Sequence, residues 1–307
     1  MGYAYPVTPA SVGSDLSTIE IHQFLKSPTL IRRALADITA QGFIADYLLG
    51  GRYKAVGGAI LYETGEVIYP ADAPEVVAPG AEFPKTVMTA GQLAAAHTAK
   101  WGQDTPVTDE AIARYNFDPA QRALLKLGNG MIRQVDSTAL SVIASLLTQT
   151  YAGGVWSEAG NIIENVLGAK AWAEENLTQY GEYDFNVVVL KPTQFAKVAA
   201  SLITSNFLPR ESGNTVETGV IPNYLGLTWT TSRYVPFTDP FLVDRNQLGG
   251  MADEDLGSPG YSRAASGIET KTIRAESRDA YDLRARRVTV PVVRDIRAGL
   301  RITGTGL

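Results

Sequence analysis

The chain of 307 residues contains no cysteine and only two histidines, His22 and His97, which lie in different segments. The absence of cysteine excludes disulfides, thiolate metal sites and cysteine nucleophiles. Two separated histidines cannot form a multi-histidine zinc site, and a Ser-His-Asp triad would have to use one of them although no serine lies in a GxSxG motif. His97 sits among alanines, so we expect it to be a packed, hydrogen-bonded residue.

The sequence also lacks long apolar runs, an excess of basic residues and a phosphate-binding loop. No apolar run approaches the roughly 20 residues of a membrane span, and the start MGYAYPVTPASVGSD lacks the basic and apolar regions of a signal peptide. We therefore expect a cytoplasmic origin and no membrane contact. The net charge of −5 argues against a dedicated nucleic-acid-binding protein, and the absence of any Gly-Lys pair excludes a GxxxxGK[ST] loop.

The composition is that of an ordinary soluble globular protein, with 45% hydrophobic and 19% charged residues. The length of the chain is enough for one large domain or two ordinary ones. The acidic run Asp253-Glu254-Asp255 could hold a hard cation, but its flanking glycines favour a solvated loop. A pair of carboxylates for glycoside hydrolysis stays open, because their separation is spatial. We predict no catalytic residue, no metal ligand and no cofactor site.

Charge is unevenly distributed along the chain. The segment from Arg263 to Arg301 contains ten basic and five acidic residues, so the remainder is strongly acidic. This asymmetry is compatible with electrostatic attraction between copies of the protein or with contact to an anion. A pair of solvated strands with charges on their outer faces is the favoured interpretation, since charge patterning mostly sets solubility and association.

Residues 57–70, GGAILYETGEVIYP, have the pattern of a β-hairpin, with a glycine pair before it and a proline after it. Two apolar runs, 59–62 and 67–69, flank a turn that is either a two-residue loop or a three-residue loop with Gly65 in the left-handed conformation. In both cases Ile60 and Tyr62 point to one face and Leu61 to the other, so both faces need a cover. The prolines at 70, 74, 79 and 84 then predict an extended, stiff excursion.

The remaining patterns predict a mixed order of helices and strands. Residues 1–16 indicate an extended arm, and residues 17–49 indicate short helices interrupted at Pro28 and Gly42. Residues 86–101 are ambiguous between helix and strand. From Asp118 to about Gln149 apolar residues recur every three or four positions and predict one long amphipathic helix; they are Leu124, Leu127, Met131, Val135, Ala139, Val142 and Leu146.

A compact α/β core and long strands are predicted after this helix. Ser157 opens a second helix, and residues 185–190 form a buried strand that leads directly into a helix with Pro192 in its first turn. Residues 225–235 and 240–245 indicate strands of a central sheet. Two long strands of mixed polarity follow within residues 266–295, and a short strand closes the chain.

Four stretches, taken in order, resemble the major capsid proteins of tailed bacteriophages, which have the Hong Kong phage capsid fold. They are VVAPGAEFPKTVMTAGQLAAAHTAKWGQD, the helix from about 118 to 149, VVVLKPTQFAKV, and IETKTIRAESRDAYDLRARRVTVPVVRDIRAGLRITG. The resemblance covers the chain from about residue 17 and depends on the order of the segments rather than on one motif. It favours a strand for residues 86–101.

The resemblance implies an α+β fold with four parts. These are an N-terminal arm (1–42), an extended loop with a β-hairpin (43–85), a peripheral domain with a long spine helix (86–150 and 266–292), and an axial domain with a central sheet (151–265 and 293–307). In this family the extended loop lies on a neighbouring subunit. We therefore expect an inter-subunit interface formed by Ile60, Leu61, Tyr62, Val67, Ile68 and Tyr69.

The implied function is that of a structural shell protein and not of an enzyme. It would form pentamers and hexamers of an icosahedral head that encloses double-stranded DNA, contacted non-specifically, and it would assemble in the host cytoplasm into the virion capsid. Scaffolding, portal and decoration proteins are the expected partners, with scaffolding supplied separately or dispensable because Met1 lies close to the arm. An encapsulin-type compartment shell is the alternative within the same fold, and a carbohydrate-active enzyme is a more distant one.

The family resemblance has one chemical departure. In the founding member of the family a loop lysine forms a covalent bond to an asparagine of another subunit. No lysine lies between Lys54 and Lys85 in this sequence. We therefore expect no covalent cross-link from the extended loop.

Overall fold

A computed structural model describes residues 17–39, 42–67, 69–70, 72–87, 90–115, 118–177, 180–205 and 226–307. The predicted arm at 1–16 and most of the loop that follows residue 205 lie outside these residues. The helices are α1 (Thr18–Lys26), α2 (Pro28–Thr39), α3 (Ile44–Leu48), α4 (Asp109–Tyr115), α5 (Asp118–Leu146), α6 (Ala159–Asn176) and α7 (Pro192–Thr204), with 3-10 turns η1 (Glu276–Arg278) and η2 (Ile296–Ala298).

Thirteen strands in the described residues form three sheets. The long sheet has six strands in the order β1 (Gly51–Lys54), β9 (Gly249–Asp253), β12 (Ala280–Val293), β11 (Glu269–Ala275) and β10 (Ser262–Arg263), with β4 (Ala99–Thr108) also paired to β12. The second sheet has the order β5 (Thr150–Ala152), β13 (Gly299–Thr303), β8 (Phe241–Val243), β6 (Val187–Leu190) and β7 (Thr228–Thr231). The third is a two-stranded ribbon of β2 (Ala59–Thr64) and β3 (Gln92–His97).

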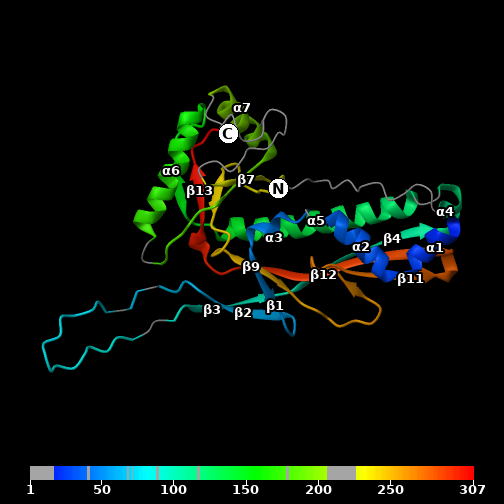
Figure 1. The fold of residues 1–307 in the computed structure, drawn as a ribbon, viewed down its shortest axis with the longest axis horizontal. Coiled ribbons are helices and arrows are strands. Elements are labelled where there is room, and N and C mark those ends of the chain that lie inside the picture. The colour runs from blue at the N-terminus through cyan, green and yellow to red at the C-terminus, as the bar shows by residue number, and fades with distance from the viewer. Residues whose placement is uncertain are drawn as a thin grey trace.

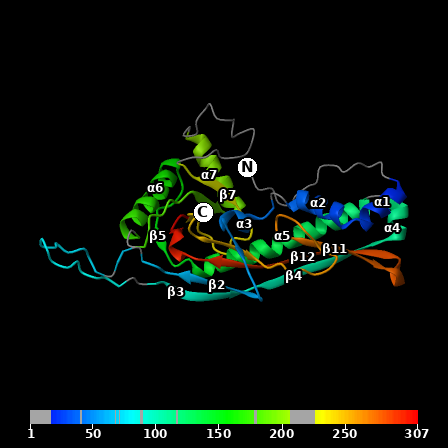
Figure 2. The same ribbon diagram turned by 60° about the horizontal axis from the view of Figure 1, so that its bottom comes forward.

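The spine of the molecule is the layer of α5 on the long sheet, as Figure 2 shows. Strand β12 pairs with β4 on one side, and with β11 and β9 in succession on the other. Helix α5 packs along β12 and β4, while α1 and α2 lie over its N-terminal half. The predicted long helix is confirmed, and it begins at Asp118, where Pro119 supplies a backbone angle that is already helical.

The apolar stripe of α5 shifts by one residue near its C-terminus. Leu124, Leu127, Met131, Val135 and Ala139 are buried as predicted. Beyond them Leu140, Ile143 and Leu147 are buried, whereas Leu146 is 37% exposed. Val142 is partly buried and packs against the core, but the prediction of Leu146 as a core residue was wrong. A helix of 3.6 residues per turn drifts around its axis, and the buried stripe follows the sheet beneath it.

Two leucines of α5 provide a matched test of this assignment. Leu127 is 1% exposed, so Leu127→Ala should destabilise the subunit by about 2 to 5 kcal/mol through lost burial and an unfilled cavity. Leu146→Ala should cost well under half of that, because much of its side chain already contacts water. Denaturant unfolding of the unassembled subunit measures both variants. Equal losses would contradict the register of the helix on the sheet.

The second sheet is covered on both faces. Val187 and Val189 of β6 join the core that contains α5, whereas Val188 and Leu190 join a second core under α6 and α7. All four are buried, which confirms the predicted buried strand, and α7 follows it at once with Pro192 at its first position. Figure 1 shows this sheet and its helices standing at one end of α5.

The ambiguous segment is strand throughout its described core. Residues 92–97 form β3 and residues 99–108 form β4, with Thr98 between them donating its backbone N–H to Gly58. The alanines of β3 pair with β2, and ten residues of β4 pair with β12; these two ladders outweigh the helix propensity of the alanines. The prediction that favoured a strand is confirmed.

Candidate assembly surfaces

The predicted local hairpin does not form. Strand β2 pairs instead with β3, in a register that joins Leu61 to Ala95 and Thr64 to Gln92. Gly65 does adopt the left-handed conformation, with φ of +75°, but the chain leaves the ribbon there instead of turning back. The predicted pairing of residues 59–62 with residues 67–69 was therefore wrong. The true partner, β3, begins 28 residues after Thr64, and no local sequence pattern indicates that the two strands pair.

The two faces of the ribbon have different surroundings. Ile60 and Tyr62 pack against a small core of the same chain, formed by Ala55, Ala252 and Val292. The opposite face presents Leu61, which is 73% exposed, and Leu93, which is 80% exposed. One apolar face is thus covered from within the subunit, and the other is open to solvent.

Between the two strands the chain makes a long excursion away from the body, as Figures 1 and 2 both show. The described residues of 65–91 contain no helix or strand. Most of their large apolar side chains are exposed to solvent; these are Val67, Tyr69, Val76, Phe83 and Val87. Such a concentration of exposed apolar groups on a segment without a core of its own indicates a surface for a partner.

The sequence analysis found part of this surface. Of its six interface residues, Leu61, Val67 and Tyr69 are exposed, Ile60 and Tyr62 face the same chain, and Ile68 lies outside the described residues. It missed Phe83 and Leu93. The signal for Phe83 was present, because a large apolar residue between prolines, in a stretch too stiff to fold back, has no core to enter.

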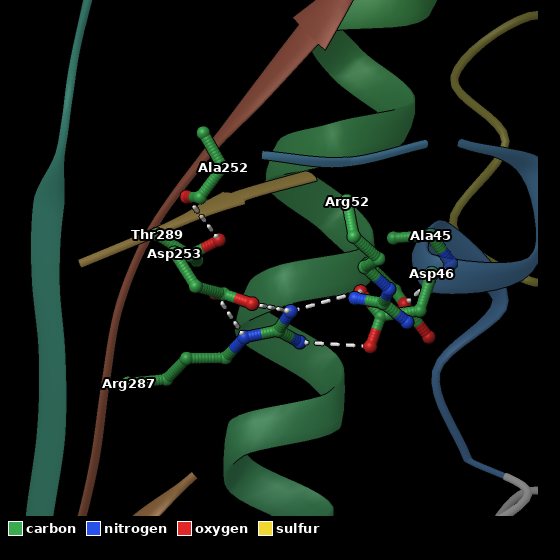
Figure 3. Close-up of polar contacts among 8 residues, drawn as sticks. Ala45, Asp46, Arg52, Ala252, Asp253, Arg287 and Thr289 are labelled. Carbon is green, nitrogen blue, oxygen red and sulfur yellow. Dashed lines mark hydrogen bonds and ion pairs between the residues drawn. The ribbon is translucent and has the colours of Figure 1, made fainter. Parts of the chain in front are cut away.

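The basic C-terminal segment supplies charge to the interior as well as to the surface. Arg287 of β12 is fully buried and contacts two carboxylates (Figure 3). Its Nε donates to Asp253 Oδ1 at 3.0 Å, and its Nη2 donates to Asp46 Oδ1 at 2.9 Å and to Asp253 Oδ2 at 3.1 Å. Arg52 reaches Asp46 from the solvent side at 2.9 Å. This cluster ties α3, β1, β9 and β12 together.

Further arginines of the same segment bind carboxylates of neighbouring elements. Arg286 contacts Glu269 in the interior at 2.7 Å, and Arg274 binds both carboxylate oxygens of Asp109. Arg284 binds Asp104 in the same two-pronged way at a half-exposed position. The favoured interpretation of a merely solvated strand pair was therefore wrong for much of the segment, because Arg284 and Arg286 bind carboxylates on neighbouring strands, and Arg274 binds the first residue of α4.

The acidic run that begins at the last residue of β9 is likewise structural. Asp253 pairs with Arg287, and Glu254 accepts hydrogen bonds from the Gly58 backbone N–H and the Thr98 hydroxyl at the base of the ribbon. The prediction of a solvated loop was wrong for these two residues. The prediction for His97 was also wrong, because its side chain is exposed at the end of β3.

Asp136 is a buried carboxyl at the junction of α5 and α3. It is 2% exposed and accepts the backbone N–H of Ala45 at 3.0 Å, at the start of α3. Burial raises its pKa to about 7, and the nearby carboxylate of Asp46 acts in the same direction, while the Ala45 hydrogen bond and Arg287 oppose the shift. The native subunit therefore holds a proton here at pH values where the unfolded chain has released it.

This linkage predicts a pH dependence with a definite sign. A carboxyl whose pKa is higher in the folded state makes stability fall as pH rises from near 4 to near 7. Asp136→Asn keeps an acceptor for Ala45 but cannot ionise, so it should be more stable than the wild type at pH 8 and similar to it near pH 4. Unfolding free energies of the two unassembled proteins across this range measure the effect. Parallel curves would contradict it.

Within the described residues, no three histidine, aspartate or glutamate side chains gather as metal ligands would. In the same part of the chain, no helix has the length and apolar character needed to cross a bilayer. The features that stand out are the exposed excursion, the open ribbon face and the rigid spine.

Comparisons with known proteins agree with this picture. A family profile described as phage capsid protein matches residues 93–302. The capsid of cyanophage P-SCSP1u has a similar structure, with a TM-score of 0.58, 10% identity, and coverage of 83% of this chain and 86% of that one. A virus-like particle from Pyrococcus furiosus gives a TM-score of 0.56 and 10% identity over 89% and 97% of the two chains.

A third structure contains the major capsid and decoration proteins of phage G, with a TM-score of 0.50 and 12% identity over 87% of this chain and 90% of that one. No curated protein matches the chain by sequence. At these identities the solved structures establish the fold, and the profile match spans more than half of the chain. The α+β fold expected from the resemblance is confirmed.

Proposed function

The chain belongs to the phage capsid protein family and is a structural, non-enzymatic shell protein of the virion capsid, and we propose that it forms the pentamers and hexamers of a head filled with double-stranded DNA. Assembly takes place in the cytoplasm of the host. Family membership excludes the carbohydrate-active enzyme that the sequence left open.

The observation that carries the proposal is the apolar surface of the excursion and the ribbon. In a lone subunit Leu61, Leu93, Val76 and Phe83 are exposed, the last two to 103% and 80%. Burying a large apolar side chain contributes roughly 1.5 to 3 kcal/mol, so a neighbouring copy that covers this surface gains substantially. In a closed shell the excursion of each subunit would lie on one neighbouring subunit, and the excursion of another neighbour would lie on it.

The inter-subunit interface that we propose differs in part from the one expected from the sequence. It contains Leu61, Val67 and Tyr69 from the original set, extended by the exposed residues of the excursion and by Leu93. Ile60 and Tyr62 support it from behind, because they anchor the ribbon to Ala252 and Val292. The proposed shell subunit is divided into the N-terminal arm, the extended loop, the peripheral domain and the axial domain that the resemblance implies.

Separate scaffolding and portal proteins are further proposed partners, and a decoration protein would bind the outer surface. The phage G structure, whose capsid is solved with decoration proteins, supports the last of these by its similar fold. An encapsulin-type compartment is the second candidate, favoured by the similarity to the Pyrococcus furiosus particle. The two candidates differ in content, which is DNA in the first case and a protein cargo in the second.

Sedimentation and negative-stain microscopy test the proposal. The protein is expressed alone and together with the neighbouring genes of its phage. We expect closed shells, and in the second preparation particles that contain DNA resistant to added nuclease. Shells that hold only protein would favour the compartment, and a monomer under all conditions would refute shell formation.

A further inference from the structure

The far end of the excursion is a tight turn formed by residues 78–81. Ala81 donates its backbone N–H to the carbonyl oxygen of Ala78 at 3.0 Å, and Gly80 has a φ of +86°. Together with Pro79 in the second position, these are the features of a type II turn. The proline fixes one backbone angle and the glycine tolerates the left-handed conformation, so the end of the excursion is held in shape before it meets a partner.

The side chains that flank this turn are apolar and acidic. Val76 is fully exposed on one limb, and Phe83 is 80% exposed on the other. Glu75 and Glu82, which precede them, are exposed as well, and neither forms an ion pair with the described residues. A complementary surface would be apolar within and would carry a cation at its edge.

A cleft with an apolar interior lies under the ribbon, between its inward face and the end of α5. Its volume is about 420 Å³. Tyr62 and Ala94, which are paired across the ribbon, form one wall. The other wall contains Ile296 and Leu146, the last residue of α5. Leu146 is partly exposed because the chain itself leaves this cleft open.

The edge of the cleft is cationic. Arg294 and Arg297 both line it. Arg297 is engaged within the subunit, because its guanidinium stacks on the ring of Tyr180 at 3.4 Å and lies 4.0 Å from Asp295. Arg294 is exposed, and no carboxylate pairs with it in the part of the chain that the structure describes. The cleft therefore has one cation available for a carboxylate from outside.

We infer that the turn at 78–81 of a second copy enters this cleft, with Phe83 against Leu146 and Glu82 paired with Arg294. The inference rests on the proposed function and deepens it, because it presupposes neighbouring copies in a shell. A turn that is already held in shape loses little conformational freedom on binding. The open face of the ribbon suits the turn less well, since Glu63 on that face would repel the two acids.

The cleft also links one contact to the next. One of its walls is the ribbon, and the ribbon is the base from which the subunit's own excursion starts. A turn that fills the cleft therefore supports the ribbon at a fixed distance from α5. Each subunit that receives a turn thereby has its own excursion positioned for the following neighbour.

Exchange of the two charges tests the inference. Glu82→Arg and Arg294→Glu each bring like charges together, so each should raise the concentration needed for assembly several-fold, whereas the double variant should assemble almost as the wild type does. Both sites are exposed, so melts of the unassembled subunits should be unchanged. Asp72→Arg, away from the turn, is the matched control and should not restore assembly to Arg294→Glu. Equal rescue by both partners, or by neither, would overturn the inference.

Cysteine cross-linking provides an independent measurement, because the chain has no cysteine of its own. Shells of Glu82→Cys combined with Arg294→Cys are treated with a short bifunctional maleimide and should give a ladder of linked chains on a denaturing gel. Glu82→Cys combined with Leu93→Cys, on the open ribbon face, should stay at the mass of one chain. A ladder from the second pair alone, or from neither, would overturn this inference alone. A wild type that forms no shells would overturn the proposed function with it.

Discussion

Leu61→Asp is expected to prevent shell assembly at the concentrations at which the wild type assembles, and to leave the isolated subunit folded. Leu61 is 73% exposed on the open face of the ribbon, so the aspartate remains in water in the monomer, and surface changes of this kind usually alter stability by no more than about 0.5 kcal/mol. In the shell the same position would lose roughly 1.5 to 3 kcal/mol of apolar burial and would bury a charge besides. Because about 1.4 kcal/mol is a factor of ten, the concentration needed for assembly should rise at least ~10-fold to 100-fold.

Two companion variants make this result specific. Leu61→Met keeps an apolar side chain of similar size and should assemble normally. Tyr62→Asp, one residue away, should instead lower the melting temperature of the free subunit, because Tyr62 packs on the chain's own small core. Sedimentation under assembly conditions, beside a thermal melt of the unassembled proteins, separates the two effects. Normal shells from Leu61→Asp would mean that this face is not an interface.

Arg287→Ala is expected to give the largest loss of subunit stability of any single change considered. The guanidinium is fully buried between Asp46 and Asp253, and its removal leaves two carboxylates that lose their shared partner. Breaking a buried ion pair from one side costs about 3 to 5 kcal/mol, a large fraction of the stability of an ordinary domain. Arg52 still reaches Asp46 from outside, but no comparable cation faces Asp253 in the described interior.

Arg284→Ala is the matched control for this prediction. Arg284 lies on the same strand and also binds a carboxylate through two nitrogens, but its side chain is 38% exposed and that of Asp104 is 39% exposed. Pairs in such surroundings contribute about 1 kcal/mol or less. Denaturant midpoints of the two unassembled variants provide the comparison. Similar midpoints at neutral pH would contradict the role assigned to Arg287.

Several helices and strands could be predicted from the sequence because their patterns are local. The long stripe of α5, the buried run before Pro192 and the alternation in β12 each depend on residues a few positions apart. Even Arg287 left a signal, since it shares a strand face with Leu283 and Ala285, both buried. A charged residue at a core position of a strand indicates an internal partner.

The ribbon could not be predicted, because its pairing depends on residues far apart. The left-handed glycine at 65 was real, yet it ends a strand whose partner begins only at Gln92. Nothing between them determines that partner, which is selected by how Ile60 and Tyr62 settle on β9 and β12. For the same reason the sequence indicated two apolar faces but did not reveal which of them the subunit covers for itself.

The length of β12 has a mechanical consequence. This one strand of 14 residues, about 47 Å at 3.3–3.4 Å per residue, is bonded to β4 over ten residue pairs and to β11 over seven. Tension along the strand would load these hydrogen bonds in shear, so that many of them must fail together rather than open one after another like a zipper. Strand β12 ends beside the turn that leads into the second sheet, so it connects the two sheets through a segment that resists stretching. A shell that bears load needs such a segment in each of its subunits.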